Sequence, residues 1–373
     1  MSNTLILCGG TGAHAGVAFL RLHTLGHALG FFNQGDKPFE FPKIFLVDQD
    51  SGDGSENEPT AWQLANSLIF QHPGRFDWFA ATGSREAPEL IKVTPLPIGP
   101  NQQWFKPPHN SLSLRFDGSP LLPVLASSRQ QQIDYSKGMM GSPAIGSLLF
   151  KLKEYDERGR ELNQDETFGQ MLKQPGRIVV AGSGVGGTGA SVGPTLAQRL
   201  AERNGNQVMA VMVLDWFVFD EEENDQDKRE KAQLRNRIMR ENANSALEFY
   251  GQSLARSVAT LPIGVPEANF AVRRYTSDVG QPLFESYIHA VAALGGMRHY
   301  LNDRPFGPGL YAMGAVERGR LSGDTAIPGG TLQDLANQSA TVLDVLETYR
   351  RVLATPQRGK VVPAIYEAVE DLV

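Results

Sequence analysis

The stretch RIVVAGSGVGGTGASVGPTLAQRLAER, residues 177–203, contains the strongest fold signal in the chain. It begins with an apolar, β-rich run at 178–181, and five glycines follow between Gly182 and Gly189. Pro194 and apolar residues at helical spacing then predict a helix. A strand, a glycine-rich turn and a helix N-terminus can together hold an anion, because glycine lets backbone N–H groups approach a phosphate. The segment therefore predicts a phosphate site, although a plain strand-to-helix turn stays possible.

A second unit of the same kind opens the chain. Residues 4–7 predict a buried strand, a glycine-rich segment covers 9–16, and a helix is expected from Val17 to Gly30. Both units carry the glycine spacing of dinucleotide-binding folds. A Rossmann-type oxidoreductase that binds NAD(P) or FAD is thus one open alternative. His14 could be a neighbour of the ligand or a helix N-terminal histidine without a ligand role.

Composition sets broad limits on the function. The chain has 373 residues, a net charge of −6 and one cysteine, Cys8. The negative charge gives no general attraction to nucleic acid, and no apolar stretch reaches the ~20 residues of a membrane span. A single cysteine cannot form an internal disulfide and suits a reducing compartment, so a cytoplasmic location is expected. We expect Cys8 to be a buried small residue rather than a nucleophile.

The run GVGGTGASVGP at residues 184–194 resembles the signature loop of the tubulin family, in the form found in the bacterial cell-division homologues of tubulin. It departs from that loop at Val185, Ala190 and Ser191. The resemblance implies an α/β fold with three layers, in which a parallel sheet holds a nucleotide at the carboxyl ends of its strands. It also implies GTP or GDP as the ligand, with Mg²⁺, and a slow GTPase that self-assembles as a homo-oligomer or filament.

Further segments match the family in its order along the chain. An acidic turn with Asp48 and Asp50 follows a predicted strand at 43–47, and Asp48 is the predicted Mg²⁺ neighbour. By resemblance, Asn244 and Gln281 would contact the base, although Asn244 could also be a surface amide. The resemblance assigns the phosphates to the glycine loops, which comprise Gly9, Gly10, Thr11, Gly12, Ala13, His14, Gly141, Ser142, Pro143, Gly184, Val185, Gly186, Gly187, Thr188 and Gly189.

Asn302 and Asp303 are the predicted catalytic residues. In the family, a loop at this place inserts into the next subunit of a polymer and orients the attacking water. Here the spacing differs, and Arg304 and Pro305 stand where a further acid is expected. This departure keeps open a second alternative, a nucleotide-binding switch or scaffold that does not hydrolyse its ligand and acts through an unknown protein partner.

The resemblance also divides the chain. Residues 1–280 would form the nucleotide-binding domain, in which 72–135 are a proline-rich, irregular insertion, and 281–303 the central helix with its loop. Residues 304–373 would form an abbreviated C-terminal domain that contains a helix at 332–353. The charged run at 220–231 reads as a solvated loop and helix start.

Overall fold

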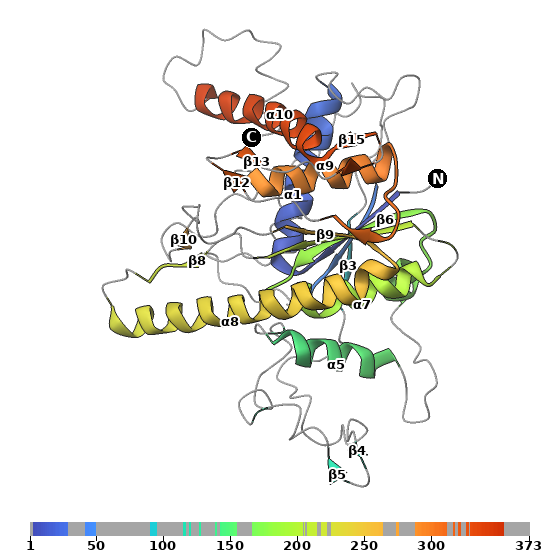
Figure 1. The fold of residues 1–373 in the computed structure, drawn as a ribbon, viewed down its shortest axis with the longest axis vertical. Coiled ribbons are helices and arrows are strands. Elements are labelled where there is room, and N and C mark those ends of the chain that lie inside the picture. Colours follow the sequence, from blue (N-terminus) through green and yellow to red (C-terminus); the bar gives the residue numbers. More distant parts are fainter. Residues whose placement is uncertain are drawn as a thin grey trace.

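A computed structural model of the chain shows a twisted sheet between two layers of helices (Figure 1). The structure describes residues 3–28, 42–49, 90–94, 115–116, 119–120, 127, 139, 142–154, 166–203, 205, 207–214, 218–221, 225–263, 274–275, 288–311, 316–317, 320–321, 326–327 and 329–353.

The central sheet has seven strands, and every neighbouring pair is parallel. Its order is β11-β9-β7-β6-β1-β2-β3. The strands are β1 (Asn3–Cys8), β2 (Lys43–Val47), β3 (Leu90–Val93), β6 (Arg177–Ser183), β7 (Gln207–Val213), β9 (Ala259–Ile263) and β11 (Gly309–Leu310). From β1 the chain continues to β2 on one side, and from β6 to β7 on the other. The order therefore reverses between β1 and β6, which is where open α/β sheets bind ligands.

The two faces of the sheet carry separate hydrophobic cores. Along β1, Leu5 and Leu7 belong to one core, and Ile6 and Cys8 belong to the other. Side chains of parallel strands are buried on both faces when helices cover both, which explains the continuous apolar runs of β1, β6 and β7. This arrangement confirms the predicted three-layer α/β fold with a parallel sheet.

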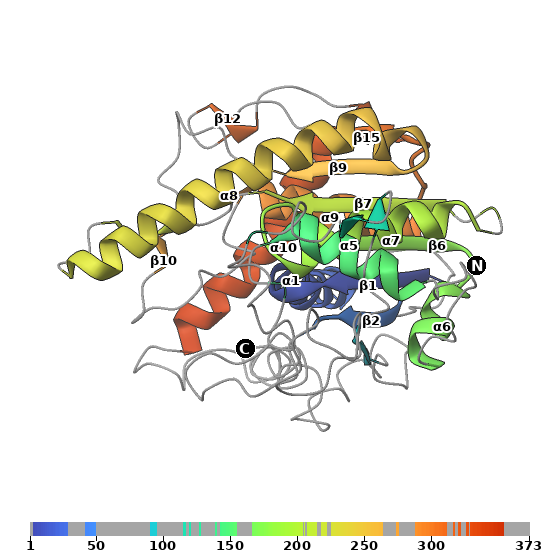
Figure 2. The same cartoon turned by 90° about the horizontal axis from the view of Figure 1, so that it is seen from below.

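The helices divide between the two faces (Figures 1 and 2). One face carries α1 (Gly9–Ala28), α9 (Ile288–Asn302) and α10 (Leu332–Leu353), and α10 packs along α9. The other carries α5 (Pro143–Glu154), α6 (Glu166–Leu172), α7 (Thr188–Ala201) and α8 (Gln226–Gln252). The N-terminal half of α8 extends past the sheet in both views.

Short elements complete the described structure. These are the strands β4 (Arg115–Phe116), β5 (Ser119–Pro120), β8 (Val218–Phe219), β10 (Arg274–Tyr275), β12 (Val316–Glu317), β13 (Arg320–Leu321), β14 (Ala326–Ile327) and β15 (Gly330–Thr331), and the 3₁₀-helix η5 (Leu254–Arg256). No helix in the described part of the chain is both long and apolar enough to cross a membrane.

Two predicted helix starts were wrong. The helix after β1 begins at Gly9 and not at Val17, and the helix after β6 begins at Thr188 and not at Pro194. Glycines and small residues predict loop by propensity, but here they let both helices pack directly on the sheet. A Cβ at position 12 would lie 2.8 Å from the Ala181 carbonyl oxygen, so only glycine permits this approach.

The segment predicted as an irregular insertion supplies one strand of the main sheet. Residues 90–93 form β3, which pairs with β2 at the sheet edge. An apolar run of this length carries too little periodicity to be recognised in the sequence. The predicted central helix corresponds to α9, described from Ile288, and the predicted helix at 332–353 is α10.

Candidate functional site

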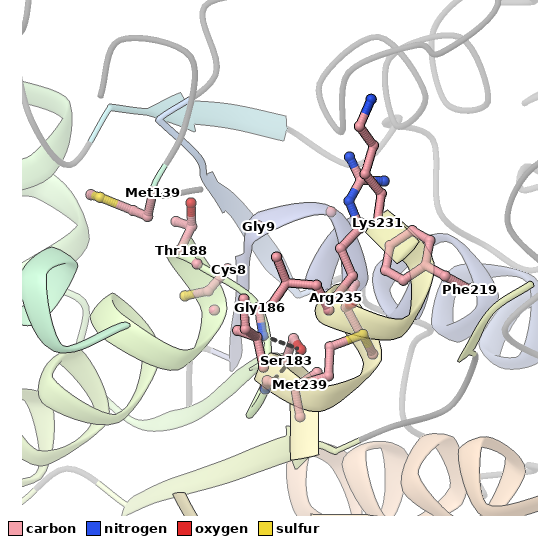
Figure 3. Close-up of a pocket in the computed structure, with 17 residues that line it drawn as sticks. Cys8, Gly9, Met139, Ser183, Gly186, Thr188, Phe219, Lys231, Arg235 and Met239 are labelled. Carbon is pink, nitrogen blue, oxygen red and sulfur yellow. Dashed lines mark hydrogen bonds between the residues drawn. The ribbon is translucent and has the colours of Figure 1, made fainter. Parts of the chain in front are cut away.

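A pocket of about 690 Å³ lies where β1 and β6 end, at the reversal of the strand order (Figure 3). Two backbone turns form one side of it, and side chains from β8 and α8 form the other. The described lining residues are Cys8, Gly9, Gly10, Thr11, Met139, Ser183, Val185, Gly186, Gly187, Thr188, Gly189, Phe219, Lys231, Leu234, Arg235, Ile238 and Met239. We call the turns formed by residues 8–11 and 183–189 the cradle.

The first turn of the cradle joins β1 to α1. Gly9 has a φ of +71°, a left-handed conformation that glycine adopts without strain. A Cβ at Gly9 would lie 3.3 Å from the Gly189 backbone nitrogen, so the two turns touch at this point. Gly10 and Thr11 then line the pocket. The sequence therefore predicted the place of this turn correctly, but it overestimated its length.

The remaining residues of the predicted first loop do not line the pocket. Gly12 and Ala13 are buried and His14 is half-buried within α1. Gly12 packs against the backbone of Leu7 and Ala181. Their helical position explains why they pack against the sheet instead of facing a ligand.

The second turn of the cradle joins β6 to α7. The Ser183 hydroxyl oxygen accepts hydrogen bonds from the backbone N–H groups of Val185 and Gly186, at 3.1 and 2.9 Å. Gly187 is the N-cap of α7 and makes no side-chain capping bond. The first N–H groups of a helix have no intrahelical acceptor and carry a partial positive charge. The start of α7 therefore offers donors to an anion in the pocket. Gly184, in the same turn, packs near Tyr250 and Leu214.

Asp48 lies behind the cradle. It is 8% exposed, and its Oδ1 accepts hydrogen bonds from the Thr188 hydroxyl at 3.2 Å and from the Gln49 N–H at 2.8 Å. Thr188 lines the pocket, but Asp48 does not. The acidic end of β2 thus supports the start of α7 through the Thr188 hydroxyl.

Cys8 forms part of the pocket floor and is buried. Burial, and the nearby charge of Asp48, raise the pKa of its thiol far above the usual range. A thiol that stays protonated is a poor nucleophile. This agrees with the prediction of a buried small residue.

The α8 side of the pocket carries two cations. Lys231 and Arg235 both line it, and the Arg235 guanidinium lies over the Phe219 ring at 4.9 Å from the ring centre (Figure 3). The charged run was predicted to be solvated, and Lys231 is indeed exposed, but it faces the pocket. A periodicity analysis cannot detect this role, because the cradle lies far away in the sequence.

Asn236 holds Phe219 in place. Its Oδ1 accepts from the Phe219 N–H at 2.9 Å, and its Nδ2 donates to the Phe219 carbonyl oxygen at 2.9 Å and to Glu221 Oε1 at 2.7 Å. The side chain is 4% exposed. These bonds join β8 to α8, and the sequence reasoning missed them.

Met139, just before the predicted loop residues Gly141, Ser142 and Pro143, lines the pocket. The Met139 carbonyl accepts from the Ser142 N–H at 2.9 Å, just before Pro143 opens α5. The start of α5 rests on α7, where the Ser147 hydroxyl donates to the Ser191 carbonyl oxygen at 3.0 Å. Ser142 and Pro143 do not line the pocket. Gly141, Asp50 and Gln281 lie outside the described residues.

Asn244 is exposed on α8 and does not line the pocket. The amide that connects α8 to the cradle is Asn242, whose Nδ2 donates to the Val185 carbonyl oxygen at 2.9 Å. The two positions are i and i+2 on a helix, so their side chains point in different directions. A sequence motif alone could not show which of these two side chains faces the cradle.

Asn302 and Asp303 lie near the amino ends of the strands, at the opposite end of the sheet from the pocket. Arg177, the first residue of β6, donates from Nη1 to the carbonyl oxygens of Leu301 and Asp303, at 3.0 and 3.5 Å. The Asn302 side chain donates to the Arg298 carbonyl oxygen at 3.2 Å. Both predicted catalytic residues are therefore near the start of β6, whereas the pocket is at its end.

The Asp303 carboxylate is engaged by two neighbours on α9. Its Oδ2 lies 3.1 Å from Arg298 Nη1 and 3.2 Å from His299 Nδ1. Partial burial opposes ionisation, but the His299 hydrogen bond and the Arg298 charge outweigh it and hold the pKa of Asp303 below its usual value. Asp303 is therefore a carboxylate at neutral pH.

No protein-family model matches the sequence, and no curated protein matches it either. Solved structures do show similarity. CetZ2 from Haloferax volcanii, a GTPγS-bound protofilament, is 15% identical with a TM-score of 0.37, and the match covers 80% of this chain and 59% of that one. CetZ1 from the same organism, a GDP-bound monomer, is 12% identical with a TM-score of 0.32, and the match covers 73% and 54%.

The chain spans less than three fifths of the length of each of these two solved chains. Among the described residues, no group of three or more His, Cys, Asp or Glu side chains could hold a metal ion.

Proposed function

We propose that the pocket binds a nucleoside triphosphate, by resemblance GTP, and that the chain is a tubulin-like nucleotide-binding protein. One observation carries this proposal. Two strand–glycine–helix turns meet at the reversal of the strand order and face two cations of α8 across one pocket. Backbone donors, a helix N-terminus and side-chain cations are the groups that hold phosphate in proteins.

The charge of the pocket supports an anionic ligand. The whole chain has a net charge of −6, but the charged side chains among the described lining residues are Lys231 and Arg235. The backbone N–H groups at the start of α7 add donors on the cradle side. A phosphate chain between the two sides would satisfy both sets of groups.

The position of Asp48 argues against the Rossmann alternative. In a dinucleotide-binding fold the acid at the end of the second strand hydrogen-bonds the ribose of NAD. Here the acid at that place is buried, is bonded to Thr188 and Gln49, and does not line the pocket. The Rossmann fold and the tubulin-like fold share this strand order, so topology does not distinguish them. The Asp48 side chain does.

Mg²⁺ fits the proposal as a partner of the phosphates. It usually takes phosphate oxygens and water together with one or two protein oxygens. The Thr188 hydroxyl at the pocket, with Asp48 behind it, suits that requirement. When bound, the ion would offset the charge of the triphosphate, while the cradle orients it.

Hydrolysis would need a second copy of the chain. Asp303 lies near the first residue of β6, and the pocket lies at its last. Because β6 has seven residues, these two ends are about 20 Å apart. Asp303 therefore cannot reach a nucleotide in its own subunit. We propose that a neighbouring subunit in a homo-oligomer or filament brings its Asp303 to the phosphates.

The non-hydrolysing switch is the second candidate, and one observation favours it. Both Arg298 and His299 already bind the Asp303 carboxylate. A carboxylate held in this way orients water poorly. The chain would then bind nucleotide and signal its state to a partner without fast turnover.

The first test identifies the ligand. Freshly purified protein is denatured, the released nucleotide is identified by chromatography, and the protein is titrated with GTP, ATP and NAD in parallel. We expect guanine nucleotide in the released fraction and the tightest binding for GTP. NAD in that fraction would favour the Rossmann alternative, and no binding at all would refute a nucleotide site.

A second test separates the slow GTPase from the switch. Phosphate release is measured against protein concentration for the wild type and for Asp303→Ala. A site completed by a second subunit predicts release that rises faster than linearly and is lost in the variant. Bound GTP without phosphate release at any concentration would support the switch.

A further inference from the structure

We propose that the second turn of the cradle, residues 183–187, has two hydrogen-bonded states, and that Ser183 and Tyr250 are positioning residues that each stabilise one of them. In the first state, which the structure shows, the Ser183 hydroxyl holds two N–H donors of the turn. In the second state the Val185 N–H faces the ligand, and the Gly184 carbonyl oxygen accepts a hydrogen bond from Tyr250. The inference rests on the proposed function, because it takes the phosphates to be in the cradle.

The Ser183 side chain occupies donors that a phosphate would use. Ser183 is buried and lines the pocket. The N–H groups that bond its Oγ belong to Val185 and Gly186, and both of these residues also line the pocket (Figure 3). Serine hydroxyls compete in this way with other partners of the nearby backbone. An anion therefore has to displace the hydroxyl before it can bind these N–H groups.

Two anchors decide which peptide of the turn can rotate. The Val185 carbonyl oxygen accepts from Asn242 Nδ2 at 2.9 Å, which fixes the peptide that follows Val185. The Gly184 N–H donates to the Val213 carbonyl oxygen at 2.6 Å, which fixes the peptide that precedes Gly184. The Gly184–Val185 peptide lies between these anchors. Among the described residues, its hydrogen bond is the one from its N–H to Ser183.

The Tyr250 hydroxyl lies against the same peptide. Tyr250 is 1% exposed, and its hydroxyl has no hydrogen-bond partner among the described residues. A Cβ at position 184 would lie 3.2 Å from this oxygen, so the hydroxyl is next to the turn. Burial raises the pKa of Tyr250, so the hydroxyl keeps its proton and is a donor. A buried donor without an acceptor is unfavourable, and the second state supplies the acceptor.

One rotation connects the two hydroxyl groups. The Val185 N–H and the Gly184 carbonyl belong to one planar peptide, so they move together. When the N–H leaves Ser183 for a phosphate, the Gly184 carbonyl turns to Tyr250. Each state then contains one hydroxyl bond to this peptide, and the ligand favours the state that presents the N–H. The affinity for phosphate is therefore set in part by the difference between the two hydroxyl bonds.

The test measures ligand binding and folding on the same full-length variants. Wild type, Ser183→Ala and Tyr250→Phe are titrated calorimetrically with inorganic triphosphate and excess Mg²⁺, and thermal unfolding is recorded without ligand. Ser183→Ala removes the competitor, so it should bind triphosphate about fivefold more tightly, although it should melt at a lower temperature. Tyr250→Phe removes the bond of the second state, so it should bind about fivefold more weakly. It should melt no lower than the wild type, because the deleted hydroxyl has no partner in the first state.

Tyr300→Phe and Ser245→Ala are the matched controls. Tyr300 is as buried as Tyr250, and the Ser245 hydroxyl bonds a backbone carbonyl oxygen, that of Glu241. Neither residue lines the pocket, so both variants should bind triphosphate as the wild type does.

Three outcomes would contradict the account. Weaker or unchanged binding by Ser183→Ala would overturn the competition between its hydroxyl and the phosphates. Unchanged binding by Tyr250→Phe, or weaker binding together with a lower melting temperature, would overturn the second state. In both cases the nucleotide site itself would stand. If the wild type bound no triphosphate, the proposed function would fail, and this inference with it.

Discussion

The Thr188 hydroxyl donates a hydrogen bond to Asp48 Oδ1 over 3.2 Å, and the two residues are 140 positions apart in the sequence. The bond connects the end of β2 to the first residue of α7. It places a buried negative charge beside a helix N-terminus, where such a charge is favourable. The start of α7, which borders the pocket, is thus held in place by the residue that follows β2.

Removing this bond should weaken the fold and the site together. Thr188→Val deletes the hydroxyl at nearly constant volume and leaves Asp48 with one donor fewer. We expect a loss of about 1–2 kcal/mol in the free energy of unfolding, measured by urea denaturation. Thr188→Ser keeps the hydroxyl and is the control. Equal stability of the Val and Ser variants would show that the bond is unimportant.

The glycines of the site should differ sharply in their tolerance of a methyl group. A Cβ at position 189 would lie 2.4 Å from the Ser183 backbone nitrogen, so Gly189→Ala should cost about 3 kcal/mol of stability. A Cβ at position 10 would meet nothing within 4 Å, so Gly10→Ala should be neutral or stabilising by up to about 1 kcal/mol. Thermal unfolding of both variants tests this, and similar melting temperatures would contradict the packing of the two turns.

The two pocket cations should control the affinity for triphosphate. The double variant Lys231→Ala, Arg235→Ala should weaken triphosphate binding about tenfold or more, and should also reduce its dependence on salt. Arg237→Ala is the control, because Arg237 is exposed on α8 but does not line the pocket. Titrations at two salt concentrations measure both effects. An equal loss in the control would mean that only the overall charge of the helix matters.

Asp303 should stabilise the protein in a pH-dependent way. Its pKa is lower in the folded protein than in the unfolded chain, so its contribution is present above about pH 4 and is lost as the pH falls through the folded value. Asp303→Asn should therefore be less stable than the wild type at pH 7, and the difference should shrink in acid. The side chain is 36% exposed and solvent screens the pair, so we expect about 1 kcal/mol at most. A difference that grows on acidification would contradict the assignment.

The sequence predicted well what depends on local runs of residues. The strands β1, β2 and β6 contain continuous apolar runs, and α10 has a clear hydrophobic stripe, so their types and most of their bounds were predicted. The starts of α1 and α7 were not, because glycine-rich helix starts depend on packing against the sheet and not on propensity. β3 was missed because four residues carry little pattern.

The site was predicted in part, for a similar reason. Gly9, Gly10, Thr11 and residues 185–189 were predicted as loop residues of the site, and they line the pocket. They could be predicted because strand–glycine–helix turns have a local sequence signature. Lys231, Arg235 and Asn236 were not located, because their roles come from the approach of α8 to the cradle. The base contacts predicted at Asn244 and Gln281 depended on the resemblance alone. Asn244 is outside the pocket, and Gln281 stays a prediction.

The most direct test of the nucleotide site is a crystal structure of the chain with a slowly hydrolysed GTP analogue and Mg²⁺. We predict phosphate density between Gly10 and Gly187. An empty cradle in crystals grown at saturating ligand would contradict the central claim.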